Sequence, residues 1–91
     1  MAIRVEFFGI ARERAGTSEL LVELRRAAAP LSNVLDEVAA RLPELGRELI
    51  VDGQLHASLT ANLDGACFVH DSATLIRDGQ SLLILSADAG G

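Results

Sequence analysis

The chain has 91 residues, a length that allows one small domain with a single hydrophobic core. Its formal net charge of −5 opposes binding to nucleic-acid phosphates and to anionic lipid. The three aromatic residues are all phenylalanine, too few for a base-stacking surface, and the single cysteine, Cys67, excludes an internal disulfide.

The N-terminal segment and the cysteine content predict a location inside the cell. Residues 1–6 lack the apolar core of a signal peptide, and no apolar stretch approaches the length of a membrane span. A single cysteine is typical of a reducing compartment. We therefore expect a cytoplasmic protein without a membrane or nucleic-acid partner.

The first residues predict a β-hairpin. Residues 3–8 alternate as in a half-buried strand, and residues 19–24 do so again after a short helical turn or loop at residues 9–16. The side chains expected to face the core are Ile3, Val5, Phe7, Leu20, Val22 and Leu24. Phe8 is then left on the outer face of the sheet.

One long helix is expected after a linker at residues 25–30. Ser32 is a good N-cap for this helix, and Pro43 marks its end. The apolar residues between them recur at helical spacing and form one stripe: Val34, Leu35, Val38 and Leu42. Residues 44–50 are ambiguous, and a further helical turn covering the sheet is one interpretation.

The C-terminal half predicts short strands between tight turns. Turns are indicated at residues 51–54, 63–65 and 77–80, each with a glycine, and strands at residues 59–62, 66–69 and 81–85. In the last strand Leu82 and Ile84 share one face, while Leu83 and Leu85 share the other.

This order of elements predicts an α+β fold. One mixed sheet of four to five strands, with one main helix packed across one face, is the economical way to bury the helical stripe. That arrangement is the β-grasp, or ubiquitin-like, fold. We expect residues 1–85 to form this domain and residues 86–91 to form a flexible C-terminal tail.

The tail ends in Ala89, Gly90 and Gly91, three residues after the most apolar run of the chain, Leu82-Leu83-Ile84-Leu85. A terminal glycine pair offers a carboxylate on backbone that has no Cβ, adopts φ > 0 and fits a narrow channel. We therefore expect the terminal carboxylate to be a reacting group. The alternative is a frayed tail without function.

Several separate marks, taken together, resemble the ubiquitin-like sulfur carriers of the MoaD/ThiS type. They run over nearly the whole chain: residues 5–9 followed by Ala11-Arg12-Glu13 and Gly16, the helix from Ser32 to Leu42-Pro43, Asn62 with Gly65, Leu75 before Asp78-Gly79, and the terminal Ala89-Gly90-Gly91. The start of the chain is most similar to the small subunit of molybdopterin synthase.

Three features depart from the pattern of that subunit. The chain is slightly long, with extra residues between Asn62 and Asp78. Ser86-Ala87-Asp88 stand where prolines usually precede the glycines, and Gln80 stands where a second acidic residue is common. A sulfur carrier for thiamine synthesis, cysteine synthesis or tRNA thiolation is therefore an alternative to a carrier for molybdenum cofactor biosynthesis.

The resemblance implies a carrier protein that is a substrate of an enzyme and is not itself an enzyme. An adenylating, E1-like partner would use ATP to activate the Gly91 carboxylate, and sulfur would then displace AMP to leave a thiocarboxylate. The large subunit of molybdopterin synthase, or another sulfur-accepting enzyme, would be the second partner. The sequence has no G-x-x-x-x-G-K-[ST] phosphate-binding loop, so we expect ATP to bind to the partner and no cofactor to bind to this chain.

Docking of such partners needs an anchoring surface beside the tail. Phe8, Leu83 and Leu85 are expected to form an apolar patch on the outer sheet face, with Ala89 and Gly90 leading to the reacting Gly91. Two other classes stay open: a ubiquitin-like modifier conjugated to lysines of other proteins, and a plain interaction module.

No metal site is expected. Cys67 and His70 have the spacing of a ligand pair, but His56 is the only other imidazole and no second cysteine exists. The chain also has no lysine, so an activated terminus finds no lysine amine on its own chain to acylate.

Overall fold

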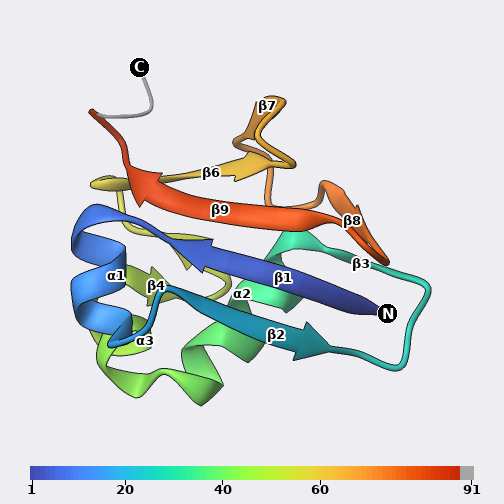
Figure 1. Ribbon diagram of the computed structural model, residues 1–91, viewed down its shortest axis with the longest axis horizontal. Helices are drawn as coiled ribbons and strands as arrows, with labels where there is room; N and C mark the ends of the chain where they lie inside the picture. The colour runs from blue at the N-terminus through green and yellow to red at the C-terminus, as the bar shows by residue number, and fades with distance from the viewer. Residues whose placement is uncertain (89–91) are drawn as a thin grey trace.

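The computed structural model describes residues 1–88. A five-stranded mixed sheet forms one layer, with strands in the order β2, β1, β9, β6 and β7 (Figure 1). Their bounds are β1 Ala2–Phe7, β2 Glu19–Glu23, β6 Leu59–Leu63, β7 Cys67–Val69 and β9 Ser81–Ser86. The central pair, β1 and β9, is parallel, and the other neighbours are antiparallel. The predicted hairpin and the β-grasp fold are confirmed.

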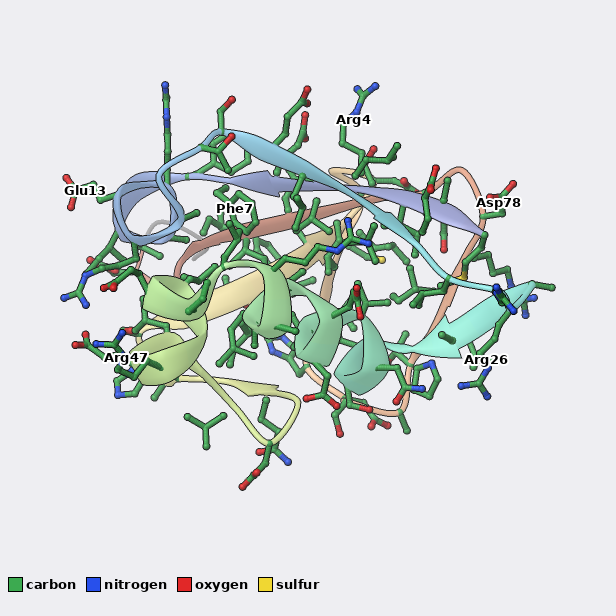
Figure 2. The ribbon with its side chains drawn as sticks, turned by 90° about the horizontal axis from the view of Figure 1, so that it is seen from below. Arg4, Phe7, Glu13, Arg26, Arg47 and Asp78 are labelled. Carbon is green, nitrogen blue, oxygen red and sulfur yellow. The ribbon has the colours of Figure 1, made fainter. Side chains whose placement is uncertain are left out.

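In the described part of the chain, three helices accompany the sheet: α1 Gly9–Ala15, α2 Leu31–Arg41 and α3 Pro43–Leu49. The longest, α2, buries Val34, Leu35 and Val38 of the predicted stripe against the strands. Leu42, the fourth member of the stripe, is the C-cap of the helix and is half-buried. In Figure 2 the helices lie below the sheet, Phe7 lies between the two layers, and Arg4 points away on the opposite side. Phe7 is 1% exposed, so one face of the sheet carries the core and the other is the outer face.

The start of α2 differs from the prediction. Its N-cap is Pro30, and Ser32 lies inside the first turn without a capping hydrogen bond from its side chain. The reason is tertiary, because the first two N–H groups of the helix already have acceptors. Leu31 N–H donates to Thr74 O at 2.8 Å, and Ser32 N–H donates to Ser72 O at 3.0 Å. Two backbone carbonyl groups from a loop far away in the sequence thus take the place of a capping side chain.

The linker predicted at residues 25–30 is also partly wrong. Its last three residues form β3 (Ala28–Pro30), which pairs antiparallel with β8 (Leu75–Arg77). Ala29 and Ile76 face each other in this pair, and both are 0% exposed. Alanine and proline have low strand propensity, so this strand depends on tertiary pairing that the local sequence does not signal.

In the ambiguous segment 44–50, residues 44–49 are helical and belong to α3, which begins at Pro43, while Ile50 begins the next strand. The turn after it is tight, as predicted, and joins β4 (Ile50–Val51) to β5 (Gln54–Leu55). Asp52 and Gly53, its central residues, both have positive φ, of 53° and 71°. That conformation is typical of the two-residue hairpin turn that aspartate and glycine favour. Among the described residues, no helix is long and apolar enough to cross a membrane.

Candidate functional site

Ser86 and Ala87, near the end of the described chain, are held by backbone pairing with β6 and with the segment before it. Ser86 pairs with Leu59 in the sheet, and Ala87 N–H donates to Ser58 O at 2.9 Å. Strand β9 thus runs one residue past the expected end of the domain, and its hydrogen bonding continues to Ala87. Figure 1 shows this end of β9 beside α1 and at the opposite end of the sheet from the N-terminus.

The segment that holds Ala87 is itself held by hydrogen bonds. His56 N–H donates to Leu49 O at 2.8 Å, and Leu59 N–H donates to His56 O at 2.9 Å. His56 is exposed, and its Nδ1 accepts a hydrogen bond from Ser58 N–H at 3.0 Å. These bonds give the base of the tail a defined position.

Phe8 lies where the sequence predicted, on the outer side next to β9. Its N–H donates to Ile84 O at 3.0 Å, which extends the parallel pairing of β1 and β9 by one residue. Successive side chains of a strand point to opposite faces of the sheet. Because Phe7 and Ile84 face the core, the next residues, Phe8 and Leu85, lie on the outer face. The Phe8 side chain is 45% exposed and therefore accessible to a partner.

Leu83 and Leu85 share the outer face of β9 with Phe8, as predicted. Both are half-buried, so they offer less surface than Phe8. In the register of the sheet, Leu83 lies between Glu6 of β1 and Asn62 of β6, and Leu85 lies opposite Thr60. The other predicted site residues, Ala89, Gly90 and Gly91, lie outside the described residues, and their roles stay predictions.

Two residues of this face were not among the predicted site residues. Asn62 and Phe68 face each other across β6 and β7, beside Leu83. Phe68 is 44% exposed, whereas Asn62 is the one buried polar residue in residues 1–88. The alternation of β6 puts Asn62 on the outer face, but only the strand order shows that Phe68 and Leu83 flank it.

The outer face carries more acidic than basic groups near these residues. Arg4 forms a 3.7 Å ion pair with Glu19 at the edge of the face. Glu6, half-buried between Glu19 and Leu83 in the register, makes no ion pair within residues 1–88. The centre of the face is therefore apolar, with one uncompensated carboxylate beside it.

The opposite, helix-covered side contains a pocket of about 230 Å³ between α2, the β4–β5 hairpin and β6–β7. His70 is the only ionisable side chain among its lining residues, so the pocket brings no acid and base together. Cys67 is exposed on β7, and residues 1–88 contain no group of three metal-ligating side chains.

No family model and no curated protein sequence matches this chain, but solved structures match its fold. SAMP1 from Haloferax volcanii superposes with a TM-score of 0.80 at 20% identity, covering 100% of both chains. A chain of the Amycolatopsis orientalis BexX/CysO complex gives 0.70 at 25% identity, covering 98% of this chain and 99% of that one. A chain from the complex of subunits 1 and 2 of molybdopterin-converting factor of Helicobacter pylori gives 0.62 at 19% identity, covering 100% of both.

These neighbours are ubiquitin-like proteins of the MoaD/ThiS type, in agreement with the resemblance carried by the sequence. They are small carrier and modifier proteins, and the likeness extends over the full β-grasp domain. Two of the three were solved in complex with a second protein. At these identities the likeness establishes the fold that the chain shares with them.

Proposed function

We propose that this chain is a sulfur carrier whose C-terminal Gly91 is activated by a partner enzyme. The partner transfers AMP from ATP to the Gly91 carboxylate and releases pyrophosphate. Sulfide sulfur then attacks the acyl carbon and displaces AMP, which leaves a thiocarboxylate. Where the donor is a persulfide of the partner, its outer sulfur displaces AMP to give an acyl disulfide, and a second thiol of the partner cleaves the S–S bond to release the thiocarboxylate and a disulfide. The chain itself supplies the carboxylate and the docking surface, and the partner supplies the ATP site.

One observation carries this proposal: β9 ends beside an apolar outer face, and a glycine pair follows it in the sequence. Within residues 1–88, the last backbone hydrogen bond of this segment runs from Ala87 N–H to Ser58 O. Four residues follow Ala87, which fully extended reach about 14 Å. That length suffices for a narrow backbone to enter a partner's pocket while Phe8, Leu83 and Leu85 contact the partner's surface.

The acceptor of the sulfur that fits best is the precursor of molybdopterin, with this chain as the non-catalytic small subunit of the synthase. The support is the start of the sequence, Phe7-Phe8-Gly9 and Ala11-Arg12-Glu13, together with the structural neighbour from molybdopterin-converting factor. Sulfur transfer for thiamine, cysteine or tRNA is the runner-up, supported by the chain of the BexX/CysO complex, whose TM-score of 0.70 exceeds the 0.62 of the molybdopterin-converting factor chain from Helicobacter pylori.

A second candidate function is conjugation to lysines of other proteins. A neighbour from Haloferax volcanii is named small archaeal modifier protein 1 and gives a TM-score of 0.77 at 19% identity. Both functions begin with the same acyl adenylate, so they differ only in whether sulfur or an amine displaces AMP.

The test is intact-mass measurement after incubation with an E1-like adenylating enzyme, ATP and a sulfur source. The starting mass first establishes that Gly91 is the terminal residue. Replacement of one terminal oxygen by sulfur then adds about 16 Da, because the rest of the chain is unchanged. The absence of lysine keeps the spectrum free of self-acylation at a lysine amine.

Two controls define the result. A chain that lacks Gly91, and the full chain without ATP, should both keep their starting mass. Adding a lysine-containing protein distinguishes the modifier, since an amide conjugate survives reductant and has the summed mass less one water. A full chain that gains no sulfur while a known carrier is charged alongside it would contradict the proposal.

A further inference from the structure

The outer face contains a buried polar group that its own fold does not satisfy. Asn62 is 8% exposed, and its Oδ1 has no hydrogen-bond partner in the described part of the chain. Buried acceptors are normally paired, because an unpaired one loses its bonds to water and gains nothing in return. An exception of this kind in a sheet face needs an explanation.

The neighbours of Asn62 in the sheet indicate what kind of group would satisfy it. A cross-strand row on the outer face runs from Glu6 through Leu83 and Asn62 to Phe68. Leu83 and Phe68 flank the amide on both sides, which explains its burial. Within residues 1–88, β7 is an edge strand of the sheet, so no further strand covers the half-exposed Phe68.

The chemistry of this row favours a cation. An amide oxygen accepts hydrogen bonds, a phenylalanine ring attracts cations to its face, and Glu6 adds a carboxylate without an ion pair in residues 1–88. No basic side chain belongs to this row, and the whole chain has a net charge of −5. The complementary group is therefore a positively charged donor from outside the chain.

We propose that Asn62, Phe68 and Glu6 form a seat for an arginine or lysine side chain of the enzyme that activates this protein. Phe68 moves aside as the partner docks, the cationic group donates to Asn62 Oδ1, and the ring and the Glu6 carboxylate stabilise its charge. The inference rests on the proposed function and adds to it a second contact, on β6–β7, next to the patch beside the tail.

One substitution at Asn62 should have two opposite effects: it should stabilise the free protein and weaken its recognition by the partner. Asn62→Leu removes an unpaired buried acceptor and should raise the midpoint of thermal unfolding of the free protein. The same substitution removes the acceptor for the partner's cation. It should raise the KM of the carrier in the charging reaction about tenfold and leave kcat unchanged, since charged hydrogen bonds at interfaces are strong.

Two further variants separate hydrogen bonding from packing. Asn62→Asp keeps an acceptor of the same size and adds a negative charge, so its KM should return to within about twofold of the wild-type value. Thr60→Val is the matched control, because Thr60 lies on the same strand and face, opposite Leu85. It removes a polar group of similar size and should change neither KM nor the unfolding midpoint appreciably.

The experiment measures steady-state charging of the full chain by the E1-like adenylating enzyme, with unfolding followed by circular dichroism. A KM for Asn62→Leu within about twofold of wild type, or an equal rise for Thr60→Val, overturns the cation seat. A lower unfolding midpoint for Asn62→Leu also overturns it, because Oδ1 then has a partner such as an ordered water. Failure of the enzyme to charge even the wild-type chain is a different result, which overturns the proposed function itself.

Discussion

At the scale of single residues, Gly46 permits the contact between α2 and α3. A Cβ at this position would lie 2.7 Å from the Cβ of Ala39 and 2.8 Å from its Cα and carbonyl oxygen. Two of these atoms belong to the backbone, which cannot move without shifting α2. Nothing in the local sequence singles out this glycine, because its neighbours Glu44, Leu45 and Arg47 fit an ordinary helix.

We predict that Gly46→Ala lowers the free energy of unfolding by about 2 kcal/mol, although alanine favours helices, because the added methyl group overpacks the helix contact. Chemical denaturation measures the change. Gly16→Ala is the control: its Cβ meets no atom within 4 Å, so only the positive φ of 74° is penalised, by about 1 kcal/mol. A Gly46→Ala protein as stable as wild type would contradict the close approach.

At the scale of elements, the short β3–β8 pair closes the end of the core and holds the start of α2. Ile76, in the middle of β8, is fully buried, and the loop before β8 supplies Ser72 O and Thr74 O to the helix. Pairs of three-residue strands are not stable alone, so this one depends on the burial of Ile76 and Ala29.

Ile76→Ala should therefore destabilise the protein by about 2–5 kcal/mol, the usual cost of removing a large buried aliphatic side chain. The neighbouring Leu75 is 52% exposed and serves as a matched control in the same strand. Leu75→Ala should change the free energy of unfolding by less than about 0.5 kcal/mol. Thermal or urea unfolding distinguishes the two, and equal effects would show that β8 does not contribute to the core.

At the scale of the whole molecule, the first and last strands lie side by side in the centre of the sheet. β9 separates β1 from β6 and contributes Leu82 and Ile84, both 0% exposed. The parallel pairing of β1 with β9 joins residues almost a full chain length apart, so the sheet can close only after the last strand has been made. The same arrangement places the base of the tail beside Phe8 and α1.

We expect a chain ending at Gln80, which lacks β9, to show no cooperative thermal transition by circular dichroism, because the sheet is then divided between β1 and β6. A chain ending at Asp88 retains all the described elements and should unfold cooperatively near the wild-type midpoint. Cooperative unfolding of the shorter chain would show that β1, β2 and the helices form a core without β9.

The sequence alone predicted the elements whose signal is local. The alternation in β1 and β9, the stripe of α2 and the aspartate–glycine turns each specify a conformation within a few residues, and the structure confirms them. The order of these elements was enough to predict the β-grasp fold, and the faces of Phe8, Leu83 and Leu85 followed from strand periodicity.

Features that depend on contacts between distant residues were decided by the tertiary structure. Ser32 does not cap α2, because Thr74 and Ser72 supply the acceptors, and residues 28–30 become a strand because β8 pairs with them. The cation seat on the outer face belongs to the same class, since Asn62 and Phe68 are six residues apart and meet Leu83 and Glu6 only through strand order. Local conformational preference depends on neighbouring residues and can therefore be predicted from the sequence. Which groups surround a buried polar side chain depends on residues that only the fold brings together.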